Sequence, residues 1–304
     1  MTSADSFAGL PGEYAVLRKR VADAGLLRRQ PGYFTRMIVV NALLLSASVT
    51  ILLLTDNVFV QLLNAAFLAF VYGQIGLLGH DAGHRQIFAS ALKNDLVSYP
   101  CALALGISAG GWIEKHNRHH AHSNRHDLDP DIEFPVVAFS EEQVERARGL
   151  KRFCIRYQSW LFFPLLSLVS LSLRKEAIRW IIQTHIRQTW LDVAVVAAHF
   201  APYLLLLFWA LPLWTGVLFI AVHQCLWGFY MGSVFAPNHK GMLMLDADDK
   251  IDFVREQVLT SRNVRPGLLT DYWYGGLNYQ IEHHLFPTMP RNNLGKARVI
   301  VKAY

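Results

Sequence analysis

The chain has 304 residues, of which 53% are hydrophobic, and its formal net charge at pH 7 is +6. This apolar content is too high and too unevenly distributed for an ordinary soluble domain, so the sequence predicts an integral membrane protein. The positive charge does not indicate nucleic-acid binding, because Lys and Arg are scattered around long apolar runs and form no basic stripe with interleaved aromatic residues.

The cysteines and the N-terminal segment exclude two further classes. Cys101, Cys154 and Cys225 each lie in an apolar stretch and no CxxC pair occurs, which argues against a disulfide framework and against a thiolate zinc site. The chain opens with a polar segment, and its first apolar run begins only near Met37. We therefore expect no cleaved secretory signal.

Four apolar segments are long enough to cross about 30 Å of hydrocarbon as helices. They cover residues 37–55, 58–79, 191–211 and 213–235 approximately. The turns inside each pair are short, at Asp56-Asn57 and around Pro212, so the segments form two hairpins. The sequence thus predicts an all-α integral membrane fold with four transmembrane helices. We interpret residues 1–304 as one domain, because no repeat or low-complexity linker interrupts them.

The basic residues indicate the orientation of these spans. Regions 1–36, 80–190 and 236–304 contain 6, 14 and 9 Lys or Arg residues, which together are all 29 in the chain. By the positive-inside rule, all three regions and both termini are expected on the cytoplasmic side of the cell membrane. Two shorter apolar stretches, Tyr99–Trp112 with its glycines and Tyr157–Leu173 with Pro164 at its centre, are interpreted as interfacial or re-entrant.

Eight of the 13 histidines occur at spacings that a metal site would use. HDAGH continues the second span, HNRHH follows the stretch Tyr99–Trp112, QIEHH lies near the C-terminus, and a single histidine follows the fourth span. Histidines three or four residues apart share one face of a helix, so two rings can bind one ion. The four sets comprise His80 and His84; His116, His119 and His120; His283 and His284; and His239.

The other five histidines have simpler interpretations. His122 and His126 are expected at the surface or beside the ligands, and His185 carries no functional assignment. His199 and His223 lie within spans, where helix contacts or polar groups of a substrate tunnel are expected.

The number and type of these residues favour two metal ions. Eight histidines exceed what one tetrahedral zinc can use, no HExxH motif occurs, and the Glu-x-x-His motifs of carboxylate-rich di-iron bundles are absent. A histidine-rich pair of ions facing a lipid-soluble substrate suggests oxygen activation, because a hydrocarbon chain offers no carbonyl or phosphate for Lewis-acid hydrolysis. The cytoplasmic helices are therefore expected to form a cap that holds a di-metal site.

HDAGH, HNRHH and QIEHHLFP, in this order relative to the spans, resemble the three histidine boxes of membrane fatty acid desaturases. The resemblance runs from the first span to Pro287, and FAPNHKGM and LNYQIEHHLFP are similar to bacterial, actinobacterial-type acyl desaturases. It implies two iron ions that use O2 and two electrons to form a double bond in an acyl chain. The substrate is then an acyl-CoA or an acyl-lipid. The implied ligands are His80, His84, His116, His119, His120, His239, His283 and His284.

Gln280 stands where many members have histidine, as in the front-end subgroup, which desaturates between an existing double bond and the carboxyl end. Gln280 and Asn238 are candidates for a ligand or for a residue that supports one. The position of the double bond and the acyl carrier stay open. The chain stops soon after the third box, so whether C-terminal sequence is missing also stays open.

The electrons are expected from a separate protein. The chain has no HPGG haem motif, no GxGxxG motif and no cysteine cluster, so no bound haem, flavin, nicotinamide or iron–sulfur centre is expected. We expect a ferredoxin-like donor, and the anionic head of the acyl carrier, to dock on a basic surface. The residues assigned to that surface are Lys115, Arg118, Arg125, Arg262 and Arg265.

Two alternatives use the same residues. A membrane hydroxylase or carotenoid ketolase has similar clusters and the same oxidant. A histidine-lined metal transporter is less compatible, because it would place polar residues along the middle of the spans, whereas these clusters lie at one end.

Overall fold

The computed structural model describes residues 12–132, 136–184 and 189–304. Within these ranges all regular elements are helical, and the only β-type pairing is an isolated bridge between Arg125 and Leu245. The chain divides into two compact units, here called unit 1 and unit 2. Unit 1 comprises residues 1–29, 114–162 and 234–304, and unit 2 comprises residues 30–113 and 163–233.

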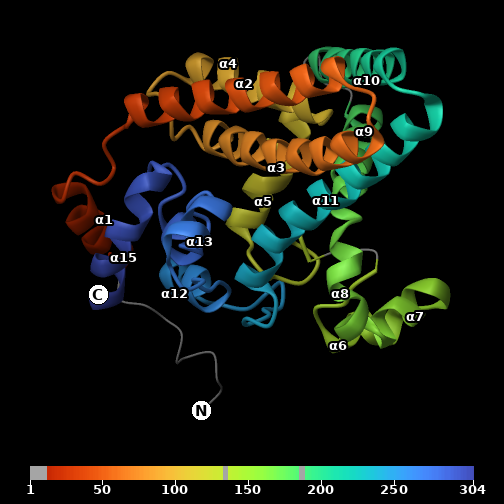
Figure 1. Cartoon of the computed structure of the whole chain (residues 1–304). Coiled ribbons are helices and arrows are strands. Elements are labelled where there is room, and N and C mark those ends of the chain that lie inside the picture. Colours follow the sequence, from red (N-terminus) through yellow and green to blue (C-terminus); the bar gives the residue numbers. More distant parts are fainter. Residues whose placement is uncertain (1–11, 133–135, 185–188) are drawn as a thin grey trace. The chain divides into compact units, whose positions relative to one another are not determined.

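Unit 2 is built on the long apolar helices (Figure 1). Four helices are long and apolar enough to cross a membrane: α2 (Pro31–Leu54), α3 (Val58–Gly83), α10 (Thr189–Ala210) and α11 (Leu213–His239). The four predicted spans therefore correspond to four helices. α3 and α11 extend past the apolar runs through the first histidine box and through His239, because these polar ends also have helical spacing.

The hairpin of α2 and α3 is tied together by polar side chains, and the two helices lie side by side in Figure 1. The Asn57 carboxamide caps α3 by accepting from the amides of Phe59 (3.1 Å) and Val60 (3.2 Å). Farther along, the Ser48 hydroxyl donates to Asn64 Oδ1 at 2.8 Å, and Asn64 Nδ2 donates to the Ser48 carbonyl at 3.1 Å. Such hydrogen bonds hold apolar helices together where hydrophobicity alone gives no preference for a partner.

Shorter helices lie wholly or partly in unit 2. α4 (Ala91–Leu105) packs on α3 and α10, and it is followed after a break at residues 106–108 by α5 (Ala109–Ala121). The axes of α4 and α5 differ by 105°, the geometry of a broken span or a re-entrant loop. This bend lies inside the stretch Tyr99–Trp112. The second stretch forms α8 (Gln158–Leu166), which contains Pro164, and the start of α9 (Val169–Gln183).

Unit 1 consists of short helices packed around an apolar cluster. Leu17 and Val21 of α1 (Glu13–Asp23) pack in this cluster with Leu285 and Met289. The remaining helices that lie wholly in this unit are α6 (Glu141–Arg146), α7 (Gly149–Arg156), α12 (Phe253–Leu259), α13 (Leu268–Trp273), α14 (Gln280–Leu285), η2 (Arg291–Asn293) and α15 (Leu294–Ala303). α12 and α15 both contact α14, the helix that carries the third histidine box.

Candidate metal site

Three histidines of unit 1, from three different helices, bring their rings together. They are His119 near the end of α5, His239 at the end of α11 and His284 in α14. One ring nitrogen of each lies within 4.8 Å of a ring nitrogen of the other two. The ring centroids are 4.7 Å apart for His119 and His239, 5.1 Å for His119 and His284, and 4.8 Å for His239 and His284.

Each of these three rings is oriented by an oxygen on its Nδ1 side. His119 Nδ1 lies 3.0 Å from both carboxylate oxygens of Asp129. His239 Nδ1 lies 3.0 Å from the Thr260 carbonyl, and His284 Nδ1 lies 2.8 Å from Gln257 Oε1. These oxygens are acceptors, so in the neutral ring Nδ1 carries the proton and Nε2 carries the lone pair. This arrangement is the one that holds metal-binding histidines in place, and the donor set fits a transition-metal ion.

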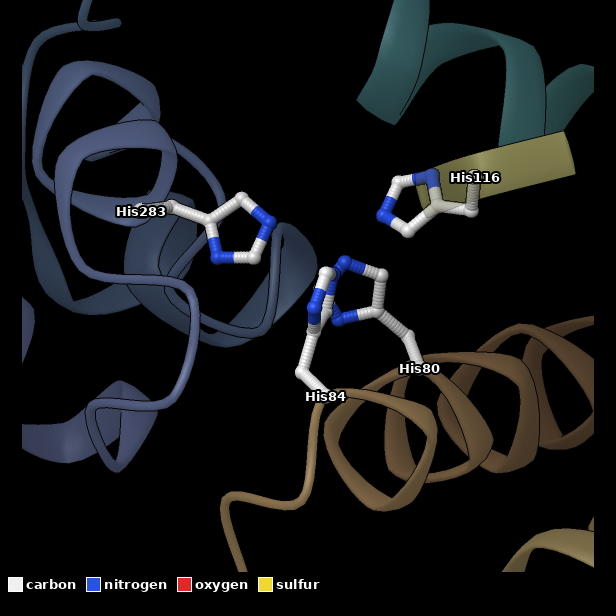
Figure 2. Close-up of side chains that lie close together, drawn as sticks. All are labelled: His80, His84, His116 and His283. Carbon is white, nitrogen blue, oxygen red and sulfur yellow. The ribbon is translucent and has the colours of Figure 1, made fainter. Parts of the chain in front are cut away.

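The other histidines of the second and third boxes surround this trio. His116 Nε2 and His120 Nε2 are 3.2 Å apart, so within HNRHH these two rings form a pair, and the His119 ring centroid lies 5.9 Å from that of His116 and 5.8 Å from that of His120. The His120 ring stacks on His284 at 4.2 Å and lies 4.8 Å from His283. The His116 and His283 rings are stacked at 6.4 Å, and Figure 2 shows both of them.

In unit 2, the first box forms its own pair. His80 and His84 project from the last turn of α3 and its C-cap, with ring centroids 4.6 Å apart (Figure 2). Both side chains are buried, at 3% and 7% exposure, and so is Asp81 between them, whose Oδ1 lies 3.7 Å from His80 Nδ1. The His80 ring also lies edge-on to Trp112, 5.6 Å away. Two buried imidazoles on one helix face are the arrangement that the HDAGH spacing predicts.

The two amides assigned to the site lie beside His239. Gln280 is buried, and its Nε2 lies 3.0 Å from His239 Nε2, so the amide can donate to the lone pair for which a metal ion would compete. Its Oε1 accepts from Asn238 Nδ2 at 3.0 Å. Asn238 Nδ2 also donates to the carbonyls of Val234 and Leu277, both at 3.1 Å. Both atoms of the Gln280 amide are therefore engaged with protein atoms, whereas the buried Asn238 Oδ1 has no hydrogen-bond partner among the described residues.

Asn124 anchors the loop behind the trio. This fully buried residue has a φ of 53°, and its Nδ2 donates to the carbonyls of His239 (3.1 Å), Leu243 (3.1 Å) and Thr260 (3.2 Å). Its backbone amide donates to Asp129 Oδ2 at 2.8 Å. One side chain thus holds the segment after α5 against the end of α11 and the end of α12.

The charges next to His119 determine its protonation. Burial is the largest single effect and lowers the pKa of the His119 ring, but the Asp129 and Asp131 carboxylates together outweigh it, and the net effect is a raised pKa. Asp131, 3.7 Å from His119 Nδ1, is paired with the Lys115 ammonium at 2.7 Å. Desolvation opposes ionisation of Asp131, yet Lys115 and His119 hold its pKa below the usual range.

Sequence reasoning missed the groups that orient the rings. No recognisable motif contains Asp129, Gln257 or Thr260. Along the chain, Gln257 is 27 residues from His284 and Thr260 is 21 residues from His239. Only the carboxylates of Asp129-Pro130-Asp131, shortly after the second box, offered a sequence signal, since carboxylates often orient metal-binding histidines.

The basic residues assigned to a docking surface occupy different environments. Arg118, Arg262 and Arg265 are exposed. Arg125 is not available for docking: it is 7% exposed, donates to Glu256 Oε2 at 3.0 Å and also binds the carbonyls of residues 246, 247 and 249. A guanidinium that folding has desolvated needs such partners, so the expectation for Arg125 is corrected to a structural role.

The remaining five histidines fall into three groups. His122 and His126 are half-buried in the loop after α5. His199 and His223 are buried in unit 2, where His223 Nδ1 lies 2.9 Å from the Tyr203 hydroxyl. His185 lies outside the described residues.

Comparison with known proteins gives the family. Residues 57–304 match the sequence model of the fatty acid desaturase family. The chain is 32% identical over 284 residues to the acyl-lipid (9-3)-desaturase of Physcomitrium patens, covering 90% of this chain and 53% of that protein. It is 32% identical over 311 residues to the Delta(5) fatty acid desaturase fat-4 of Caenorhabditis elegans, with 95% and 66% covered. The Delta(6)-fatty-acid desaturase fat-3 of the same organism is 31% identical over 309 residues, with 95% and 68% covered.

The chain thus spans between about half and two thirds of the length of these relatives. The family match covers the second span, all three histidine boxes and the C-terminal helices. The chain therefore belongs to the fatty acid desaturase family.

Proposed function

We propose that this protein catalyses the O2-dependent desaturation of a fatty acyl chain. The balanced reaction removes two hydrogens from adjacent carbons and reduces O2 with two further electrons and two protons, giving one carbon–carbon double bond and two waters. Membership of the family and the names of the relatives support this reaction. The apolar helices support a substrate that reaches the site from the bilayer.

We further propose that the eight histidines bind two iron ions. The observation that carries this proposal is the set of three rings, His119, His239 and His284, each with an oxygen at Nδ1 and a lone pair on Nε2. Bound iron would supply the activation of O2 that removal of hydrogen from an unactivated chain requires. Asp129, Thr260 and Gln257 hold the rings, and Gln280, held by Asn238, is assigned a place beside His239 and not on the metal.

The site is proposed to lie on the cytoplasmic side of a multi-pass membrane protein. The distribution of all 29 basic residues outside the predicted hairpins supports this orientation. An external ferredoxin-like protein is the proposed electron donor. Exposed Arg118, Arg262 and Arg265 of unit 1 are the groups we assign to its docking, together with Lys115.

We propose that the new double bond forms between an existing double bond and the carboxyl end of the acyl chain. Two observations support this assignment: relatives named Delta(5) and Delta(6) desaturases, and Gln280 at the first position of the third box. An acyl-lipid is one candidate substrate, because the moss relative is named an acyl-lipid desaturase.

Expression in a host that lacks the activity tests this function. The host would co-express a ferredoxin and its reductase and receive polyunsaturated precursors, and double-bond positions would be determined by mass spectrometry. New double bonds are expected from the wild type and from His126→Ala, a histidine outside the proposed set, and none from His119→Ala. An unchanged lipid profile with a working donor would exclude desaturation, and hydroxylated products alone would identify a hydroxylase.

A further inference from the structure

The break between α4 and α5 contains backbone groups that need partners. α4 ends with carbonyls that have no partner within the helix, and α5 begins with amides in the same situation. In the apolar surroundings of a membrane unit, such groups are costly unless the protein satisfies them. Part of this need is met locally: Ile107 N donates to the Ala102 carbonyl at 3.1 Å, and Gly111 N donates to Ser108 Oγ at 2.8 Å.

Arg174 of α9 meets the carbonyl end of α4. Its Nη2 donates to the Leu105 carbonyl at 3.2 Å, and its Nη1 donates to Gln224 Oε1. The side chain is 9% exposed, and its guanidinium carbon lies 4.9 Å from the centre of the Trp227 ring. A positive charge at the C-terminal end of a helix is stabilised by the helix dipole. His199 of α10 adds a hydrogen bond from its ring to the Leu103 carbonyl in the same turn.

Asp192 of α10 meets the amide end of α5. Its Oδ1 accepts from Gly110 N at 3.4 Å, a long hydrogen bond strengthened by the negative charge, and the side chain is 3% exposed. A carboxylate at the N-terminal end of a helix matches the opposite pole of the dipole. The two helices of the bend therefore receive a cation at a C-terminus and an anion at an N-terminus, both from neighbouring helices of unit 2.

Three glycines allow these side chains to approach the bend. A Cβ on Gly106, whose φ is +68°, would lie 2.3 Å from the His199 ring. A Cβ on Gly110 would lie 2.9 Å from Asp192 Oδ2, and one on Gly111 would lie 2.6 Å from the Trp180 ring. These distances are shorter than any normal contact, so the bend is packed tightly against α9 and α10 at the positions where the charged groups act.

We propose that Arg174 and Asp192 are positioning residues that clamp the α4–α5 bend and so fix the direction of α5. The consequence for the metal site rests on the proposed function, because α5 carries His116, His119 and His120. Loss of either charge leaves buried backbone groups poorly compensated at the bend. α5 can then adopt more than one direction relative to α4, and the turns that carry its three histidines are held less firmly.

A distance measurement tests the clamp without relying on catalysis. Spin labels are attached at Leu96→Cys on α4 and Glu114→Cys on α5, two exposed positions, in a Cys225→Ser background because Cys225 is the exposed cysteine. Electron–electron resonance on the purified protein should give one narrow distance distribution. Arg174→Gln and Asp192→Asn should each broaden it or add a second population, whereas Arg179→Gln, an exposed position of the same helix, should not. Unchanged distributions in both clamp variants would overturn the proposal.

Metal affinity provides the second readout. We expect Arg174→Gln and Asp192→Asn to bind Co(II) about tenfold more weakly, within the range found when groups that support metal ligands are lost. Arg174→Lys, which keeps the charge and one donor, should recover part of the affinity, and it replaces Arg174→Gln if that variant does not fold. If the distance distributions broaden in the clamp variants but the wild type shows no desaturase activity, the clamp is upheld and the proposed function is rejected. If the distributions are unchanged and the wild type is an active desaturase, the clamp is rejected and the proposed function is upheld.

Discussion

His119 Nδ1 lies 3.0 Å from both carboxylate oxygens of Asp129, and both side chains are buried. A carboxylate in this place holds the ring orientation and makes Nε2 a better metal donor. We therefore expect Asp129→Asn to weaken metal binding by about 10- to 100-fold. Isothermal titration of the metal-stripped protein in detergent measures this change.

Asp127→Asn is the matched control for that substitution. Asp127 is exposed two residues away, and its positive φ of 59° suits asparagine. It should bind metal as the wild type does. Equal affinity in Asp129→Asn and Asp127→Asn would mean that the carboxylate plays no part in holding the metal.

The raised pKa of His119 predicts how metal binding depends on pH. A proton on Nε2 competes with the metal, so affinity should decline on acidification from a higher pH than for an ordinary histidine. Asp129→Asn removes the charge that raises the pKa most, while Asp131 remains. Its decline should therefore shift to lower pH, even though its affinity at neutral pH is weaker. Titrations between about pH 5 and 8 measure both curves, and a shift to higher pH in the variant would contradict the assignment.

Gln280 and His239 are expected to differ sharply in their effect on the metal. The Gln280 Oε1 accepts from Asn238 and its Nε2 faces His239 Nε2, so we place it beside a ligand and not on the metal. Gln280→Ala should keep the full number of metal ions per chain and bind them at least as tightly, because the amide donates to the lone pair that a metal would take, whereas His239→Ala should lose metal. Metal analysis after gel filtration measures both. Loss of an ion in Gln280→Ala would identify this residue as a direct ligand.

Asn124 should contribute to stability through two separable effects. Asn124→Ala leaves three buried carbonyls without their donor and places alanine at a φ of 53°, so the free energy of unfolding should fall by about 3 kcal/mol. Asn124→Gly removes the same hydrogen bonds without the backbone strain and should be about 1 kcal/mol less harmful. Denaturant unfolding in detergent compares them, and equal stabilities would show that strain contributes nothing.

The four long helices and the histidine boxes could be predicted because their signals are local. Hydrophobic length identifies a span, and a spacing of three or four residues places two rings on one helix face. The limits of α3 and α11 were underestimated for the same reason: hydropathy ends at Gly79 and Phe235, while the helices continue to Gly83 and His239. The actinobacterial subtype remains a prediction.

The partners of the site could not be predicted because they depend on long-range packing. The His284 ring contacts Gln257, which is 27 residues away in the sequence. Arg125 donates to Glu256, which is 131 residues away. No local pattern distinguishes such an arginine from an exposed one, which is why Arg125 was assigned to docking. The bend after α4 was recognisable from its glycines, but the charged side chains that meet it come from α9 and α10.

Metal replacement in the purified protein tests the central claim most directly. The protein would be stripped with a chelator, reloaded with Fe(II) or Zn(II), and supplied with acyl substrate, O2, a ferredoxin and its reductase. Two iron ions per chain and new double bonds only in the iron-loaded sample are expected. Double bonds formed equally by the stripped or the zinc-loaded protein would contradict the assignment of these histidines to an iron-dependent desaturase.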